Sequence, residues 1–412
     1  MHTQFFSAPR SARIERHRHA LLAAGVFLVL GFHVGVWAVE LPRLADALHL
    51  EPGALGAAVS ASAAAGIVTL FGGGRLADRF GRRPVLLAGF GGTAAAFVSL
   101  AQVRSTPMLI LVFVLYGLTV SFIDLGANTV GSDYERTHGR QAMTGLHAGF
   151  SLGALLGALA SSLLLWAGAG FRTVYVLLAV VLALTALITA VASLPTRNAG
   201  HQGAEAGGAA SARPERPVWR ELGVVLAMGA VTVTFFGDGA LESFLGVFLT
   251  RWNAPDGVLT GIGIGGYHLA SLIGRLGSVG VQQRWGERRL LFCAGILAAA
   301  GMTAVVESTT PVPAICGLLA VGAAVAPVVP LALSLAGRSV PGHAGKAVAL
   351  TTAVGYSAFV AGPALIGALA DATSLRTALA LLIVTSLTVS ALAVRWPART
   401  RVGGPDGRSV ET

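Results

Sequence analysis

Long apolar stretches recur along the whole chain and constrain its fold more than any other feature. A helix needs about 20 mostly apolar residues to cross the hydrocarbon core of a bilayer. Twelve such stretches lie at approximately 20–39, 54–74, 84–102, 107–130, 142–166, 172–194, 220–248, 258–280, 289–307, 313–336, 347–370 and 376–396. They are too long for barrel strands, and isolated strands would leave backbone groups unpaired in lipid. We therefore expect twelve transmembrane helices.

The composition agrees with a bilayer as the solvent. Of the 412 residues, 54% are hydrophobic and only 12% are charged, whereas soluble domains carry about 25% charged residues. The 54 glycines suit helices that pack closely in lipid, because small residues let two backbones approach each other. The chain is predicted to be an all-α integral membrane protein.

The connections between the spans carry positive charge in an alternating pattern. Of the 29 Lys and Arg residues, 23 lie in the two terminal segments and in every second connection, and only 5 lie in the other connections. Because cytoplasmic loops are rich in Lys and Arg, both termini are expected in the cytoplasm, in a multi-pass protein of the cytoplasmic (inner) membrane. The same distribution accounts for the net charge of +10, so nucleic acid is not expected as a partner. The first span is too long for a signal peptide and is expected to be retained.

A polar connection divides the spans into two sets of six. Residues 195–219 are rich in Gly, Ala, Pro and Arg, which is typical of a flexible linker. We expect one six-helix bundle over 20–194 and a second, related bundle over 220–396. The end segments 1–19 and 397–412 are predicted to be cytoplasmic tails.

The connection between the second and third spans contains a motif of glycines and charges. It reads GGGRLADRFGRRP and fits the pattern G-x-x-x-D-R-x-G-R-R. The bias of cytoplasmic loops toward positive charge explains the arginines, but not the aspartate and glycines at these spacings. The matching residues are Gly74, Asp78, Arg79, Gly81, Arg82 and Arg83.

This motif resembles the signature of the major facilitator superfamily, which occupies the same loop. The resemblance implies two pseudo-symmetric six-helix bundles and transport by alternating access. It also implies that the loop is a conformational latch, in which Asp78 reaches the start of the eleventh span near 346–351. The corresponding loop of the second half reads GRLGSVGVQQRWGERR and has Gln283 in place of the aspartate, so we expect a weaker latch there.

Longer segments refine the resemblance. The fourth and fifth spans read DLGANTVGSDYERTHGRQAMTGLHAGFSLGALLGA, the seventh contains GDGALESFLGVFL, and the eleventh contains VGYSAFVAGPALIGALAD. Together they are similar to a bacterial group of inner-membrane permeases related to fucose permeases. The fourth span lacks the intramembrane Arg of drug antiporters. The fifth has glycines at 145, 149, 153 and 157 but no Gly-Pro pair, which weakens an assignment to drug export.

Ionisable residues inside the spans are few, and such residues usually face a cavity or one another. Asp124 and Asn128 share a face of the fourth span because they are four residues apart. His147 lies at a similar depth in the fifth span. We expect Asp124 and His147 to pair, either as a gate or proton-coupling pair or as a structural pair near the cytoplasmic interface.

A second group of polar residues lies on the first and seventh spans, which the resemblance implies are partners that line the cavity. His33 and Trp37 share a face of the first, and Asp238 and Glu242 share a face of the seventh. We predict that these four form the substrate or proton site, because repulsion between the two carboxylates favours a proton on one of them. The alternatives are that Glu242 lies in water at the outer interface, and that His33 or Trp37 only packs.

Two other regions have polar residues of lesser promise. His268 lies mid-membrane in the eighth span, beside Tyr267, and is a weaker candidate for the cavity. Arg275 lies near the predicted cytoplasmic end of that span, where a long side chain can reach the interface. Glu40 falls in the first outer connection and is expected to be solvated.

The sequence shows no motif of a soluble enzyme. It lacks a P-loop with Gly-Lys-Ser/Thr, so ATP-driven pumping is not expected. The run GIGIGG at 261–266 follows no strand and is interpreted as helix packing. With only Cys293 and Cys316 as cysteines, no disulfide framework or metal site is expected. We expect no catalytic residue, no metal and no cofactor.

These observations predict a secondary active transporter. It is expected to act as a monomer in the bilayer and to move a small organic solute by alternating access, with protons as the coupling ion. A uniporter and an exporter that exchanges a drug or secondary metabolite for protons are alternatives. A non-transporting sensor or scaffold of the same fold is an alternative of another class, which the intact Asp78 motif argues against.

Overall fold

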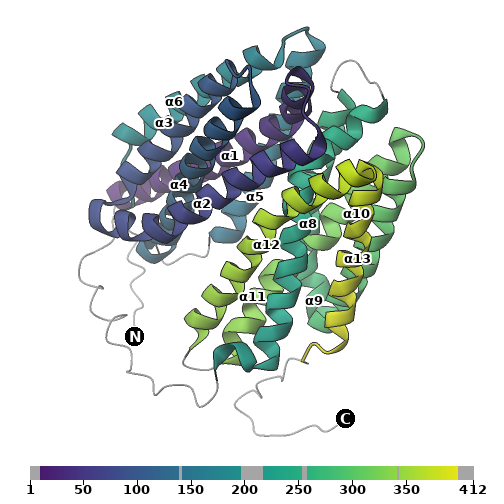
Figure 1. Ribbon diagram of the computed structural model, residues 1–412. Coiled ribbons are helices and arrows are strands. Elements are labelled where there is room, and N and C mark those ends of the chain that lie inside the picture. The colour runs from purple at the N-terminus through teal and green to yellow at the C-terminus, as the bar shows by residue number, and fades with distance from the viewer. Residues whose placement is uncertain (1–9, 139–141, 196–216, 253–257, 341–342, 398–412) are drawn as a thin grey trace, which may run out of the picture.

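The part of the chain that the structure describes is built of helices and contains no strand (Figure 1). This computed structural model describes residues 10–138, 142–195, 217–252, 258–340 and 343–397, with all their side chains except those at 10–12, 70–78, 144 and 251. Most of the predicted linker 195–219 therefore lies outside the described residues.

Six helices make up the first half. They are α1 (Arg10–Ala47), α2 (Pro52–Phe80), α3 (Arg82–Leu100), α4 (Thr106–His138), α5 (Met143–Trp166) and α6 (Phe171–Val191). The helix α1 begins inside the stretch 1–19 that was predicted to be a tail, and it continues through Pro42. The apolar stretches thus predict the spans, but several helices extend beyond them.

The second half begins with short turns of 3₁₀ helix around its first span. Its elements are η2 (Val218–Arg220), α8 (Leu222–Leu249), η3 (Thr250–Trp252), α9 (Val258–Glu307), α10 (Pro311–Val325), α11 (Val328–Ser339), α12 (Ala344–Ala372) and α13 (Leu375–Val394). Pro327, which has no N–H to donate to a helix, separates α10 from α11, and these two helices together cover the predicted tenth span.

The helix α9 contains two of the predicted spans. Its backbone leaves the helical conformation at Gly286, where φ is 79°. In the described part of the chain, eleven helical segments are long and apolar enough to cross a membrane when α9 is counted once. Dividing α9 at Gly286 gives the twelve spans expected from the sequence, in an all-α membrane fold.

The helices form two bundles that meet at one end and diverge at the other (Figure 1). In the first bundle α1 packs along α5, and α4 contacts both α2 and α3. In the second, α8 packs on α12, while α10 and α13 pack on α9. The bundles contact each other mainly through α2 with α12 and through α5 with α9.

Glycines bring α1 and α5 into close contact. Gly153 and Gly157 on α5 lie directly against the backbone of Leu28 and Phe32 on α1, so that a Cβ atom at either glycine would collide with the main chain. Small residues at helix interfaces are typical of membrane proteins, where packing rather than water drives association. Two of the four glycines noted in the fifth span therefore have a structural role.

Hydrogen bonds join the two bundles at the end where they meet. The N–H of Gly53, in the first turn of α2, donates to the carboxylate of Asp371 on α12 over 2.9 Å. The hydroxyl of Ser60 donates to the carbonyl of Val360 over 2.6 Å and accepts from the N–H of Ala364 over 3.0 Å. Ser60 thus inserts into one turn of α12, beside its internal proline.

Candidate functional site

A cavity of about 700 Å³ lies between the two bundles. Residues of α1 and α5 form one wall, and residues of α8, α9, α10 and α11 form the other. Its ionisable or amide-bearing lining residues are His147, Asp238, Glu242, Tyr267, His268, Arg275 and Gln282. The volume lies in the range typical of small-molecule sites, and we call this space the main cavity.

A second space of about 310 Å³ adjoins the main cavity. The two share Val34, Trp37, Phe150 and Glu242 in their walls. The second space is lined by α1, α2, α4, α5, α8 and α12, and we call it the side chamber. Its aromatic and polar lining residues are His33, Trp37, Ser62, Tyr116, Ser121, Asp124, Phe150, Glu242, Ser243, Tyr356 and Phe359.

The predicted residues of α1 form the aromatic wall of the side chamber. The ring of Trp37 stacks on that of Tyr116, with centroids 4.8 Å apart and 18° between the planes. His33 is completely buried. Its Nδ1 lies 2.5 Å from the carbonyl oxygen of Leu30, and its Nε2 lies 3.1 Å from the Tyr116 hydroxyl. Because both ring nitrogens are engaged, His33 positions Tyr116.

The predicted pair of Asp124 and His147 is not formed between these two described side chains. Asp124 lines the side chamber and accepts a hydrogen bond of 3.0 Å from the amide of Asn128. His147 lines the main cavity instead, with its ring against that of Phe27 at 5.1 Å. The two residues have similar depths, but their helices direct them into different spaces.

The two carboxylates of α8 both face the space between the bundles. Asp238 lines the main cavity, accepts a hydrogen bond from the Tyr267 hydroxyl and lies within electrostatic range of Arg275. Glu242, one helical turn further on, lines both the main cavity and the side chamber. Glu242 is therefore exposed to the space between the bundles and does not lie at the outer interface.

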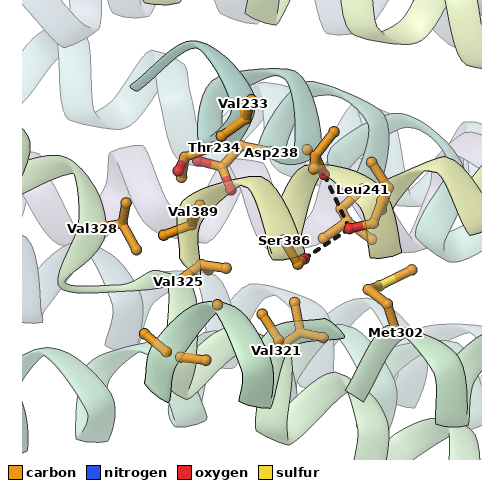
Figure 2. A pocket seen from close by; sticks show the side chains of 17 residues that line it. Val233, Thr234, Asp238, Leu241, Met302, Val321, Val325, Val328, Ser386 and Val389 are labelled. Carbon is orange, nitrogen blue, oxygen red and sulfur yellow. Dashed lines mark hydrogen bonds between the residues drawn. The ribbon is translucent and has the colours of Figure 1, made fainter. Parts of the chain in front are cut away.

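Asp238 also borders a much smaller cavity inside the second bundle, which Figure 2 shows. Its volume is about 30 Å³, and aliphatic side chains such as Val321 and Val389 provide most of its lining. The hydroxyl of Ser386 donates to the carbonyl of Leu382 over 2.7 Å. A space of this size holds about two water molecules and is too small for an organic solute.

Arg275 lies in the candidate site and not only at the edge of the membrane. The sequence places Arg275 near the cytoplasmic end of its span, where its side chain could reach the interface, whereas in the structure Arg275 lines the main cavity. Its buried Nε has no hydrogen-bond partner among the described residues. Asp238, His147 and His268 all lie within its electrostatic range. The first helix within α9 continues beyond the predicted span to Gly286, so Arg275 lies further from its end than the sequence suggests.

His268 lies in the main cavity, as the sequence suggests for a mid-membrane residue. The centre of its ring lies 6.5 Å from that of Phe150 on α5 and 5.4 Å from that of its neighbour Tyr267. The contact with Phe150 joins the two bundles at the cavity wall.

Glu40 is completely buried, which contradicts its expected solvation. It accepts a hydrogen bond from the hydroxyl of Ser161 on α5, and the Tyr175 hydroxyl of α6 lies within its electrostatic range. The helix α1 continues through Pro42, so Glu40 lies inside a span and not in a connection.

The loop that carries the signature motif is described only in part. The side chains of 70–78 lie outside the described residues, and so does the predicted latch contact of Asp78 with the eleventh span; Gly74 belongs to the same stretch. Gly81 has a φ of 86°, in the left-handed region that glycine adopts most easily. This glycine turns the chain from α2 into α3.

The arginines of the motif have distinct surroundings. Arg79 is exposed and lies 5.2 Å from the centre of the Phe80 ring. Arg83 donates to the carbonyl of Ala192 over 2.7 Å, at the end of α6. Its contact holds the start of α3 against α6.

Arg82 belongs to an ion pair that has a counterpart in the second bundle. Its Nε donates to Asp133 of α4 over 2.9 Å. In the second bundle Arg338 of α11 binds Glu287 through both terminal nitrogens, at 3.0 Å for Nη1. Each pair is separated by 51 residues in the sequence, but the positions of the acid and the base are exchanged. Sequence reasoning identified neither Asp133 nor Glu287.

The arrangement of two bundles around one cavity agrees with the comparisons with known proteins. The family model described as the Major Facilitator Superfamily matches residues 21–279 and 230–411. The chain belongs to this family. The family predicted from the signature motif is thus confirmed, together with a multi-pass membrane transporter fold.

Several bacterial relatives resemble this major facilitator protein over most of their length. An uncharacterised MFS-type transporter of Yersinia pestis is 28% identical over 372 residues, covering 89% of this chain and 93% of the relative. The uncharacterised transporter y4wD of Sinorhizobium fredii is 26% identical, with coverage of 86% and 92%. The membrane protein MosC of Rhizobium meliloti is 25% identical, with coverage of 92% and 90%.

Solved structures share the fold at low sequence identity. The nucleoside transporter NupG, as a D323A mutant, has a TM-score of 0.73 at 13% identity, covering 93% of this chain and 99% of NupG. A bacterial homologue of the human lysosomal transporter Spinster, in an inward-facing and occupied conformation, has a TM-score of 0.67 at 15% identity, with coverage of 95% and 97%. Both likenesses support the fold alone.

Proposed function

We propose that this chain is a secondary active transporter that moves a small organic solute across the cytoplasmic membrane by alternating access, coupled to protons. The observation that carries the proposal is the main cavity, which has charged groups in its wall and lies between two bundles that contact each other at one end. Two bundles that rock around a central site are the general scheme of such transporters. Because both walls of the cavity come from one chain, we propose that the monomer is the working unit.

The position of the contacts gives the proposed direction of opening. The bundles are joined at the end that holds Gly53 and Ser60. The main cavity extends toward the other end, where it reaches Gln282 and Leu333. The connections on that side are rich in Lys and Arg, which favours a cytoplasmic location. We therefore interpret the structure as open to the cytoplasm, with both termini on that side.

Proton coupling is proposed to use the carboxylates of α8. Asp238 and Glu242 are one helical turn apart and both face the main cavity. Like charges repel strongly where water is scarce, so binding of a proton by one of them lowers the electrostatic energy. Arg275 lies within electrostatic range of Asp238 and is suited to respond when that carboxylate gains or loses a proton.

The proposed function is tested with purified protein in proteoliposomes and a panel of sugars, amines and organic acids. The expected result is uptake of at least one solute that depends on an imposed pH gradient, with a change of internal pH reported by an enclosed dye. Asp238→Asn and Glu242→Gln should lose gradient-driven uptake, whereas Glu51→Gln, an exposed residue outside both spaces, should retain it. Proton coupling would be contradicted if every transported solute were taken up at the same rate with and without the pH gradient.

The same vesicles distinguish the alternatives. Accumulation of the solute driven by an inward-directed proton gradient identifies a symporter, and extrusion of the solute driven by the same gradient identifies an exporter that exchanges it for protons. Absence of transport for the whole panel in both orientations would support the non-transporting sensor or scaffold.

A further inference from the structure

We propose that the side chamber binds a protonated amine of the transported solute, with Asp124 and Glu242 as its counter-charges, an inference that rests on the transport function proposed above. The two carboxylates come from different bundles, Asp124 from α4 and Glu242 from α8, and both line the chamber. Tyr356 of α12 lies within electrostatic range of both, so the two acids flank one tyrosine.

The two acids of the chamber differ from Asp238 in their charged surroundings. Asp238 has Arg275 within its electrostatic range. The charged group near Glu242 is another acid, Asp238, and the polar partner of Asp124 is the neutral amide of Asn128. Neither Lys nor Arg occurs among the described residues that line the side chamber. A carboxylate with no positive group nearby attracts a cation, and a protonated amine of the solute can supply that charge.

Histidine does not supply the missing positive charge. His33 lines the chamber, but its two ring nitrogens face the Leu30 carbonyl and the Tyr116 hydroxyl. His147 and His268 line the main cavity and lie within electrostatic range of Arg275. The charged residues of the chamber are therefore acids, and the other two histidines, His147 and His268, belong to the arginine-bearing side of the site.

Aromatic rings complete a site for an organic cation. Trp37 stacks on Tyr116, and Phe359 and Tyr356 also line the chamber. A cation close to the face of such rings is attracted by their electron density, most strongly by tryptophan. The hydroxyls of Ser62 and Ser121 are available to solute hydroxyl groups. These features together favour a small, polar, amine-bearing solute, such as an amino sugar or an amino alcohol.

The position of the acids also links binding to the movement of the bundles. An amine between Asp124 and Glu242 contacts one carboxylate from each bundle. In that position it would join the two bundles across the side chamber. The bound amine is therefore expected to stabilise a closed, occupied state more than a neutral solute of the same size does.

The test uses matched solutes that differ only in charge. Glucosamine is compared with glucose and N-acetylglucosamine, and ethanolamine with ethylene glycol and N-acetylethanolamine, by titration calorimetry on the full-length protein in nanodiscs at a pH where the amines are protonated. We expect at least one amine to bind about tenfold or more tightly than its two neutral counterparts, as a charge-assisted contact would give. Glu242→Gln and Asp124→Asn should each remove about that factor, and Glu51→Gln should leave binding unchanged.

Three results would overturn the proposal: equal binding of an amine and its neutral counterparts, unchanged amine binding in both variants, or no binding by either amine. The unfolding temperature of each variant, measured in parallel, shows whether a loss of binding reflects loss of the fold. Where Asp124→Asn loses the fold, Asp124→Glu, which keeps the negative charge, replaces it as the test at that position and should still bind the amine.

Transport distinguishes the two proposals, because uptake of only neutral or anionic solutes refutes the amine site and leaves the transporter standing. Amine binding without transport of any solute refutes the transporter and leaves the site standing.

Discussion

The two bundles use the same ion-pair position with opposite charges. In the first, the base is Arg82 at the start of α3 and the acid is Asp133 on α4. In the second, the acid is Glu287 after the break in α9 and the base is Arg338 on α11. A glycine in the left-handed region, Gly81 or Gly286, precedes each pair. The comparison teaches that the geometry of this position matters in both halves, whereas the order of the charges does not.

Each ion pair lies within one bundle, Arg82 with Asp133 in the first and Glu287 with Arg338 in the second. Each joins the end of one span to the start of another on the side where the bundles diverge (Figure 1). We infer that the pairs keep each bundle rigid while the bundles move relative to each other. The contacts that must break during transport are instead those between bundles, such as Gly53 with Asp371.

The acids of the two pairs differ in the number of their described partners. Glu287 is buried and, besides Arg338, accepts hydrogen bonds from the amide of Gln282 at 3.1 Å and from the indole of Trp396 at 3.2 Å. It therefore ties α9 to both α11 and the residues after α13. Substitutions at the second pair should consequently have the larger effects.

The largest effect is expected for Glu287→Ala. The substitution removes the acceptor of Gln282, Arg338 and Trp396, and because hydrogen bonds to a charged group are worth about 1.5–3 kcal/mol each, the loss should be about 3–5 kcal/mol. The free energy of unfolding in detergent, from denaturant titration, provides the measurement. The matched control is Glu307→Ala, which removes an exposed pair with Arg376 and should cost less than about 1 kcal/mol. An equal decrease in the free energy of unfolding in the two variants would show that the contacts of Glu287 stabilise the fold no more than an exposed ion pair does.

A smaller effect is expected for Asp133→Ala in the first bundle. The loss of one charge-assisted contact to Arg82 should lower the free energy of unfolding by about 1.5–3 kcal/mol. The exchange variant R82D/D133R, which copies the charge order of the second bundle, should recover most of that loss. An exchange variant no more stable than Asp133→Ala would mean that the order of the charges is fixed in this half.

The two left-handed glycines should respond equally to alanine. No atom lies within 4 Å of a Cβ built at Gly81 or Gly286, so the cost comes from the backbone conformation alone, about 1–3 kcal/mol at each position. Gly277 in α9 also has open space around it but no positive φ, and Gly277→Ala should not destabilise. The unfolding temperatures of the three variants provide the measurement. Equal unfolding temperatures in all three would contradict the prediction.

The smallest effect is expected for Ser60→Ala, at the contact between the bundles. Removing its two hydrogen bonds to α12 should weaken the contact by about 1 kcal/mol and favour separation of the bundles at that end. Distances between spin labels on α2 and α12, measured by pulsed electron paramagnetic resonance, report the shift. An unchanged distance distribution would show that Ser60 has no part in closing this end.

The sequence predicts the spans and the family because these depend on local patterns. Stretches of about 20 apolar residues are visible without tertiary structure, and so is the spacing of the signature motif. The extent of the helices is less visible, because α1 and the first part of α9 continue beyond their apolar cores. For this reason Glu40 was expected in water and Arg275 at the interface, although Glu40 is buried and Arg275 lines the main cavity.

The contacts within the site depend on rotation about each helix axis, which depth along the chain does not give. Asp124 and His147 have similar depths but face different spaces. Glu287 and Asp133 are also ordinary charged residues in the sequence until the fold brings each to its arginine. A search for oppositely charged residues with the same separation in both halves could have found these two pairs.

The most direct test of alternating access is a reversible cross-link between the bundles at the end where they meet. Gly53→Cys and Asp371→Cys, placed where the two residues now share a hydrogen bond, are introduced into a chain in which Cys293 and Cys316 are replaced by serine. Solute uptake by proteoliposomes is then measured before oxidation, after oxidation and after reduction. The account predicts that oxidation stops uptake and that reduction restores it, whereas uptake at an undiminished rate by the fully cross-linked protein would contradict it.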